Sequence, residues 1–162
     1  MPKKILFVCT GNSCRSVMAE YLMRKRLQSA SGESPPPDYE AASAGVAALD
    51  GMRASDETLR VLHERAGVDA AGHSARRLMD PMVREAALVC VMEHWQREEI
   101  LRRVPEAVNK VRLLTDVGPL SGEGMVGEEI VDPIGKPREV YETCYAIIER
   151  CVDQIAGSLT AV

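Results

Sequence analysis

The sequence predicts an α/β protein of three layers, with a four-stranded parallel sheet between two layers of helices. Short apolar runs typical of buried strands alternate along the chain with segments whose apolar residues recur at helical spacing. Such alternation gives a parallel sheet that helices cover on both faces. The chain has 162 residues, enough for one substantial core, and shows no internal repeat. We therefore expect residues 1–162 to form a single domain.

The individual elements follow from local patterns. The expected strands are short apolar runs rich in β-forming residues: 3–8, 40–44, 86–92 and 111–114. The expected helices have apolar residues three and four apart: 15–29, 55–66, 95–103 and 139–159. Ser55 is the predicted N-cap of the second helix, Gly67 ends it, and Pro105 closes the third.

Two loops stand out. The segment 31–37 contains three consecutive prolines, which cannot continue a helix. The segment 115–135 contains five glycines and two prolines. A loop of that length in a compact domain is usually functional or disordered.

Composition excludes several classes of function. The net charge is −4, which gives no reason to expect nucleic-acid binding, and no stretch approaches the ~20 apolar residues of a membrane span. Five cysteines without a secretion signal indicate the cytoplasm, where thiols stay reduced. Their spacing with the three histidines matches no zinc pattern. We expect a monomer without metal or cofactor.

The candidate site is the loop between the first strand and the first helix. It contains eight consecutive residues: Cys9, Thr10, Gly11, Asn12, Ser13, Cys14, Arg15 and Ser16. Ligands of parallel sheets bind beyond the carboxyl ends of the strands, and a helix N-terminus attracts phosphate through unpaired N–H groups and its dipole. Gly11 and Asn12 tolerate left-handed backbone, so the loop can turn its amides inward. The loop is therefore predicted to bind phosphate.

Within this loop the residues divide the chemistry. The helix N-terminus and a nearby cation favour the thiolate of Cys9, which makes it the predicted nucleophile. Arg15 can hold two phosphoryl oxygens at once with its planar guanidinium. Ser16 can donate a hydrogen bond to the sulfur and ease its departure. A buried cysteine alone is usually a small packing residue, but the complete loop favours catalysis. No GxxxxGK[ST] or GxGxxG motif offers a rival phosphate loop.

These residues resemble the low-molecular-weight protein tyrosine phosphatase family over nearly the whole chain. The resemblance rests on the segments 8–16 (VCTGNSCRS), 18–20 (MAE), 42–45 (ASAG), 72–76 (GHSAR) and 131–133 (VDP). It implies the Rossmann-like phosphotyrosine phosphatase I fold and a phosphorylated protein as the substrate.

The resemblance also supplies a general acid. Family members use an aspartate in a late Asp-Pro pair, here Asp132-Pro133, and a carboxylic acid can protonate a phosphoryl leaving group. Asp80-Pro81 is the competing pair. We expect Asp80 instead to cap a short helix with Pro81 at its first position.

Further roles are implied by the resemblance. Ser43 and His73 are expected to join Asn12 and Ser16 in a hydrogen-bond network that holds the loop. Cys14 is expected to form a protective disulfide with Cys9, which would prevent irreversible oxidation. The remaining cysteines lie on predicted core faces and are expected to be inert: Cys90, Cys144 and Cys151.

Three substrate classes share this scaffold. Tyrosine phosphatases usually carry a bulky aliphatic residue at the position of Ser13 and aromatic residues after the Asp-Pro pair. Protein-arginine phosphatases carry a small polar residue at that position, and Ser13 resembles this pattern. The residues after Asp132-Pro133 are Ile134-Gly135, which are less aromatic than a slot for a phenyl ring requires. Thioredoxin-linked arsenate reductases need two further cysteines in a mobile segment, where only Cys90 is present. Phosphotyrosine is the main expectation and phosphoarginine the alternative. An inactive phosphate-binding module would lack the cysteine, arginine or aspartate, and none is missing.

Overall fold

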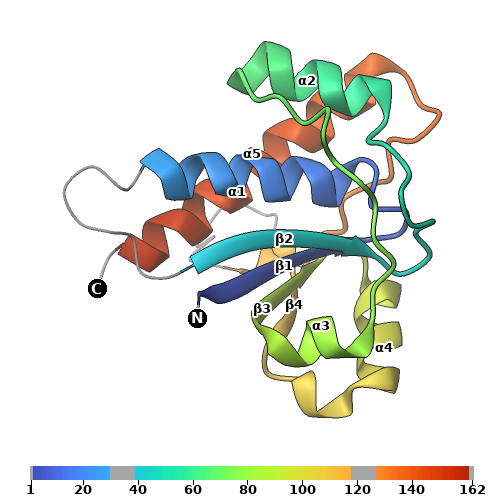
Figure 1. The fold of residues 1–162 in the computed structure, drawn as a ribbon, viewed down its shortest axis with the longest axis vertical. Coiled ribbons are helices and arrows are strands. Elements are labelled where there is room, and N and C mark those ends of the chain that lie inside the picture. The colour runs from blue at the N-terminus through green and yellow to red at the C-terminus, as the bar shows by residue number, and fades with distance from the viewer. Residues whose placement is uncertain (1, 30–38, 118–126, 161–162) are drawn as a thin grey trace.

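The computed structural model describes residues 2–29, 39–117 and 127–160 (Figure 1). Among these residues four parallel strands form one sheet in the order β2-β1-β3-β4. The strands are β1 (Lys3–Cys9), β2 (Tyr39–Gly45), β3 (Ala86–Val91) and β4 (Val111–Leu113). The helices are α1 (Arg15–Ser29), α2 (Asp56–Ala66), α3 (Asp80–Glu85), α4 (His94–Arg103) and α5 (Arg138–Thr160), with short 3₁₀ turns η1 (Pro105–Ala107) and η2 (Leu114–Asp116).

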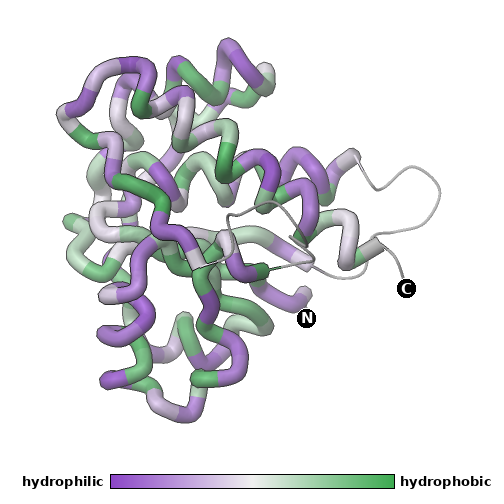
Figure 2. The backbone as a smooth tube through the Cα atoms, turned by 180° about the vertical axis from the view of Figure 1, so that it is seen from behind, coloured by the Kyte–Doolittle hydropathy of each residue, from purple (hydrophilic) through white to green (hydrophobic). Residues whose placement is uncertain are grey.

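The helices form two layers, one on each face of the sheet. Helices α1 and α5 lie on one face with α2 packed against them, and α3 and α4 lie on the other (Figure 1). Along β1, Ile5 and Phe7 pack into the core between the sheet and helices α1 and α5. Leu6 and Val8 pack into the core on the other face, with α3 and α4. A strand buried on both faces reads as one continuous apolar run, which is why this strand was predictable. Figure 2 shows hydrophobic segments through the sheet and hydrophilic ones along the outer helices.

The predicted fold class is confirmed, and the predicted elements agree with the structure to within about two residues. Ser55 caps α2, because its hydroxyl accepts a hydrogen bond from the Thr58 N–H. Gly67 ends that helix in the left-handed conformation, at φ 65°. The proline-rich segment 31–37 and residues 118–126 of the long loop lie outside the described residues.

Two predictions need correction. The fourth strand ends at Leu113 rather than at residue 114, because Leu114 begins the 3₁₀ turn η2. Asp80 is the first residue of α3 and not its cap. Met79 takes the capping position in an extended conformation, and the Asp80 carboxylate pairs instead with the guanidinium of Arg103 at 2.6 Å.

The topology determines where a ligand can bind. The connection from β1 to β2 runs through α1 on one face, and the connection from β3 to β4 runs through α4 on the other. The carboxyl ends of the adjacent strands β1 and β3 therefore flank the point where the chain changes direction, which is where parallel sheets bind ligands. The loop 9–16 leaves β1 at this point.

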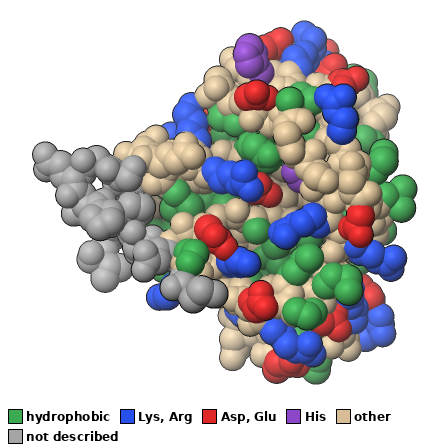
Figure 3. Space-filling view, in the orientation of Figure 1, with side chains coloured by type: hydrophobic (Ala, Val, Ile, Leu, Met, Phe, Trp, Pro, Cys, Tyr) green, Lys and Arg blue, Asp and Glu red, His purple; other side chains and the backbone are tan. Residues whose placement is uncertain are grey.

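Figure 3 shows basic and acidic side chains interspersed on the face presented, rather than gathered by sign. Within the described ranges, none of the helices is long and apolar enough to cross a membrane. The same ranges contain no group of three or more His, Cys, Asp or Glu side chains that could hold a metal ion.

Candidate active site

The loop at the end of β1 borders a cavity of about 190 Å³. Its lining comes from the loop and from the segment after the long glycine-rich loop: Cys9, Thr10, Gly11, Ser13, Cys14, Arg15, Asp132 and Ile134. The fold thus brings the predicted nucleophile, the predicted phosphate-binding arginine and the predicted acid to one place.

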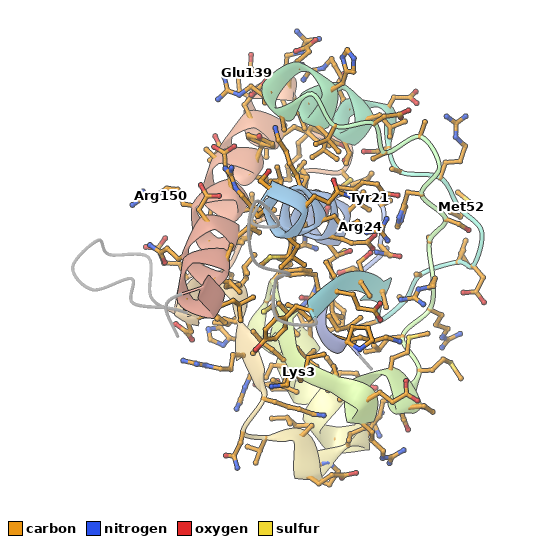
Figure 4. All side chains as sticks on the ribbon, turned by 60° about the vertical axis from the view of Figure 1, so that its left-hand side comes forward. Lys3, Tyr21, Arg24, Met52, Glu139 and Arg150 are labelled. Carbon is orange, nitrogen blue, oxygen red and sulfur yellow. The ribbon has the colours of Figure 1, made fainter. Side chains whose placement is uncertain are left out.

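A larger hollow of about 420 Å³ lies elsewhere, between α1 and the outer edge of β2. Tyr21 and Arg24 line it from α1, and Figure 4 shows these two side chains side by side. The cationic side chains that line this hollow each have a partner in the protein; Arg24, for example, pairs with Glu20. The lining contains no cysteine. Size alone therefore does not identify the functional cavity, and the predicted catalytic residues line the smaller one.

The loop backbone has one strained position and one tight contact. Asn12 has φ 52°, the only positive value for a non-glycine residue in the described parts of the chain. Gly11 has no positive φ, so the left-handed residue is the asparagine, which tolerates it through its short polar side chain. Across the sheet, a Cβ on Gly45 would lie 2.6 Å from the Thr10 carbonyl oxygen and 2.8 Å from the Asn12 nitrogen. Gly45 therefore permits the close approach of the loop to β2.

A chain of hydrogen bonds leads from Cys9 into the core. The Ser16 Oγ lies 3.0 Å from the Cys9 Sγ, and Asn12 Nδ2 donates to both Ser16 Oγ and Ser43 Oγ at 2.8 Å. Because Asn12 donates to the Ser16 oxygen, the Ser16 hydrogen is left for the sulfur. The Ser43 hydroxyl in turn donates a hydrogen bond to the carboxylate of Glu20 at 2.6 Å. The chain therefore orients the Ser16 hydroxyl toward the predicted nucleophile.

Two more residues hold Asn12 from the segment after α2. His73 Nε2 lies 2.8 Å from the Asn12 carbonyl oxygen, which can only accept, so this ring nitrogen carries the hydrogen. The Arg76 backbone N–H donates to Asn12 Oδ1 at 2.9 Å. The Arg76 guanidinium also donates to the Ser43 carbonyl. The expected hydrogen bonds of Ser43 and His73 to the loop are thus present in the structure.

Arg15 is buried, with 1% of its surface exposed, and it is tightly held. Its Nη1 donates to Glu93 Oε2 and to the Ile130 carbonyl, each at 2.7 Å. Its Nη2 lies 3.4 Å from Thr10 Oγ1 and 3.6 Å from Asp132 Oδ2. Since Nη1 gives both hydrogens to the protein, the edge formed by Nε and Nη2 is the one that can face a phosphoryl group.

Asp132 stands at the cavity mouth on an anchored segment. Its side chain is 41% exposed, and its Oδ1 accepts from the Ile134 N–H at 3.1 Å. The Ile130 N–H donates to the Met92 carbonyl, and the Cys144 thiol donates to the Val131 carbonyl. These bonds tie the segment to the end of β3 and to α5. The competing Asp80 does not line the cavity.

The five cysteines lie in the described residues as free, buried thiols. The Cys14 Sγ is 3.2 Å from the Ser55 Oγ and 3.8 Å from the Tyr141 hydroxyl. Cys9 and Cys14 are both in the thiol form, and the disulfide between them stays a prediction. Burial raises the pKa of Cys144 and of Cys151 to about 11, and it also raises the pKa of Cys90. Buried thiols of this kind are poor nucleophiles, in line with the inert role expected for them.

Three residues of the site were not predicted from the sequence. Glu93 binds Arg15 and Gln96 binds Thr10, and the buried Glu20 accepts the last hydrogen bond of the series that begins at Cys9. Glu93 and Gln96 form a capping box at the start of α4. Polar residues directly after β3, the neighbour of β1, carried the available signal, because strand ends meet at the ligand edge of the sheet. Glu20 gave only the weaker signal of a carboxylate on the apolar side of a helix.

Comparisons with known proteins show which family the chain resembles. The family model for low molecular weight phosphotyrosine protein phosphatases matches residues 4–162. A protein-arginine-phosphatase of Geobacillus stearothermophilus is 36% identical over 98% of this chain and 97% of its own. The protein-tyrosine-phosphatase Etp of Escherichia coli K12 is 33% identical over 96% and 94%. The crystal structure of a low molecular weight protein tyrosine phosphatase from T. tengcongensis superposes on this structure with a TM-score of 0.84 at 31% identity. The match covers 96% of this chain and 99% of that one.

The fold and the site define a cysteine-dependent phosphatase. The chain belongs to the low molecular weight phosphotyrosine protein phosphatase family.

Proposed function

We propose that the enzyme hydrolyses phosphotyrosine in proteins through a cysteinyl-phosphate intermediate. The observation that carries this proposal is the meeting of Cys9, Arg15 and Asp132 around one cavity. Those three groups supply a nucleophile, a cation for the phosphoryl oxygens and a proton donor for the leaving group, which together complete a phosphoryl transfer.

In the first half-reaction, the Cys9 thiolate attacks phosphorus as the bond to the tyrosine oxygen breaks. The Nη2–Nε edge of Arg15 and the loop N–H groups neutralise the charge on the phosphoryl oxygens. The Asp132 carboxyl group gives its proton to the departing phenolate, so that tyrosine leaves as a neutral phenol. Asp132 suits this task because it stands at the mouth, 3.6 Å from Arg15.

In the second half-reaction, water attacks the cysteinyl phosphate. The Asp132 carboxylate takes a proton from that water, phosphate is released, and the sulfur–phosphorus electron pair returns to Cys9. The Ser16 hydroxyl, 3.0 Å from the sulfur, stabilises the thiolate that forms.

Phosphoarginine is the alternative substrate, and one feature favours it. Ser13 places a small polar side chain in the cavity lining, where a bulky aliphatic residue would favour a phenyl ring. A protein-arginine-phosphatase is among the relatives. The steps would be unchanged, except that Asp132 would protonate a guanidine nitrogen.

Side-by-side turnover of phosphotyrosine and phosphoarginine peptides decides between these substrates. We expect faster turnover of phosphotyrosine, and a Ser13→Ile variant should raise the ratio further. Preference for phosphoarginine in the native enzyme would establish the alternative. A Cys9→Ser variant should be inactive on both peptides, and residual turnover by it would refute the nucleophile.

The acid is tested by a matched pair of variants. Asp132→Asn should slow hydrolysis of phenyl phosphate, a poor leaving group, by about 10²-fold or more, and that of p-nitrophenyl phosphate less. Asp80→Asn, at the competing Asp-Pro pair, should leave both rates within about twofold. The reverse result would assign the acid to Asp80.

We further infer a phosphorylated protein as the partner, and a monomer of one domain, residues 1–162, acting in the cytoplasm. One copy of the chain carries every residue of the proposed mechanism, so a second subunit is not required. A reducing compartment suits a nucleophile that must stay a free thiol. Light scattering of the purified protein measures its oligomeric state, and a dimer that loses activity on dilution would contradict this inference.

A further inference from the structure

Gln96 occupies a fixed position beneath the phosphate loop. The residue is fully buried in the first turn of α4. Its Oε1 accepts hydrogen bonds from the Met92 and Glu93 N–H groups at 2.9 and 3.0 Å. Backbone N–H groups can only donate, so the orientation of the amide is determined by its partners and Nε2 must be the donor end.

The donor end faces two groups of the candidate site. Gln96 Nε2 donates to Thr10 Oγ1 at 3.2 Å and to Glu93 Oε2 at 3.3 Å. The same Glu93 oxygen receives the 2.7 Å hydrogen bond from Arg15. One amide therefore joins the loop to the carboxylate that holds the arginine.

The Thr10 hydroxyl consequently has one direction left for its hydrogen. Its oxygen receives hydrogen bonds from Gln96 Nε2 and from Arg15 Nη2, and both of these nitrogens are donors only. In the part of the chain that the structure describes, no acceptor is paired with the Thr10 hydrogen. Thr10 lines the cavity beside Cys9 and Arg15. A phosphoryl oxygen bound there is the acceptor that this hydrogen lacks.

We propose that Gln96 is a positioning residue that fixes Glu93 against Arg15 and directs the Thr10 hydroxyl hydrogen at a phosphoryl oxygen of the substrate. This inference rests on the proposed function, in which Arg15 and the loop bind the phosphoryl group. It adds a side-chain donor to the backbone N–H groups of the loop. A hydrogen bond to a charged acceptor strengthens binding by about tenfold or more.

The Thr10 half of the proposal is tested with inorganic phosphate in isothermal titration calorimetry. Thr10→Val removes the hydroxyl at constant shape and should weaken phosphate binding by about tenfold. Thr10→Ser keeps the hydroxyl and should bind within about threefold of the native enzyme. Native affinity in Thr10→Val would overturn the proposal, even if the Gln96 variants failed to fold.

The Gln96 half is tested by the pH dependence of phosphate binding. In Gln96→Glu the new carboxylate faces Glu93 and cannot donate when ionised, so binding relative to the native enzyme should fall about tenfold at pH 7.5. Burial and the neighbouring Glu93 raise the pKa of such a group, and protonation restores a donor. The deficit should therefore shrink as the pH falls to 5.5. Gln96→Met should show a deficit that does not change with pH.

A purely structural role for Gln96 would lower the thermal stability of both Gln96 variants while leaving their phosphate affinity within about threefold of the native enzyme, and that result would overturn the positioning role. Comparison of each variant with the native enzyme at the same pH removes the titration of phosphate itself. Native enzyme that neither binds phosphate nor hydrolyses p-nitrophenyl phosphate would refute the proposed function together with this inference. Active native enzyme with unaffected Thr10→Val and Gln96→Glu variants would refute this inference alone.

Discussion

Arg15 Nη1 lies 2.7 Å from Glu93 Oε2, which places a carboxylate directly behind the cation that is to bind the phosphoryl group. The Arg15 side chain is 2% exposed and the Glu93 side chain 23%. A buried cation of this kind needs a fixed partner, because breaking a buried pair leaves an uncompensated charge. Glu93 therefore holds the arginine in place before any substrate arrives.

Removal of that partner should cost both stability and affinity. We expect Glu93→Ala to lower the free energy of unfolding by about 2–3 kcal/mol, below the range for a fully buried pair since Glu93 is partly exposed. Thermal denaturation measures this loss, and phosphate titration should show weaker binding. Glu129→Ala is the control: it removes a carboxylate that accepts a hydrogen bond from the His94 N–H at the start of the same helix, and the variant should be close to native. Native stability and phosphate affinity in Glu93→Ala would contradict the role of this pair.

Gly45 should not tolerate a side chain. Its Cβ would fall 2.6 Å from a backbone oxygen of the loop, so Gly45→Ala must displace the loop or β2. We expect an overpacking cost of about 1–3 kcal/mol and a large fall in kcat/KM on p-nitrophenyl phosphate. Gly72→Ala serves as the matched control, because a Cβ there meets nothing within 4 Å and the variant should keep native activity. Equal activity of the two variants would refute this account of the loop packing.

Loss of the Ser43 hydroxyl should slow turnover by about tenfold, because Asn12 and Glu20 both lose a partner in the chain that orients Ser16. Rapid-quench kinetics of Ser43→Ala should show the defect in release of phosphate from the cysteinyl intermediate, the step that regenerates the thiolate. The exposed Ser74 lies near His73, and Ser74→Ala should behave as the native enzyme does. A Ser43→Ala variant with unchanged kcat would mean that the chain does not act on Cys9.

Alkylation should separate the cysteines by pH. A thiol with a pKa of about 11, as burial gives Cys144 and Cys151, is a thiolate in roughly one molecule per thousand at pH 8. Iodoacetamide at pH 8 should therefore modify Cys9 first, and mass spectrometry of the digested protein locates the label. Modification of Cys144 and Cys151 should grow as the pH rises toward 11. Rapid labelling of these two at pH 8 in folded protein would contradict their buried state.

The raised pKa values also give a direction to alkaline stability. A group whose pKa is higher in the folded than in the unfolded chain stabilises the fold below its unfolded pKa, and that contribution is lost as the pH rises through the folded value. For Cys144 and Cys151 the window runs from about 8.5, the ordinary thiol value, to about 11. We expect the free energy of unfolding in urea to decrease across this range. The double variant Cys144→Ala/Cys151→Ala should show a smaller decrease than the native protein, and an identical decrease would count against this assignment.

Local signals made the fold and the loop predictable from sequence. The strand 3–9, the loop and α1 follow one another along the chain, so the residues that define the phosphate site are near neighbours. Glu93 is 78 residues from Arg15, and only the adjacency of β1 and β3 brings the two together. A single sequence carries no record of such a pairing. Asp80 was misplaced by one position for a local reason, because an extended Met79 can take the capping position without a capping side chain.

The long reach of the Arg15 contacts also governs when activity can begin during synthesis. Arg15 is held by Glu93 and by the carbonyl of Ile130, which follows it by 115 residues, and α1 packs against the C-terminal helix α5. The cysteine loop therefore leaves the ribosome long before its arginine can be fixed or its acid is present. A growing chain carries a thiol but no assembled catalyst. Activity should arise only when the C-terminal helix has been released and has docked, so an unfinished chain would not dephosphorylate the proteins around it.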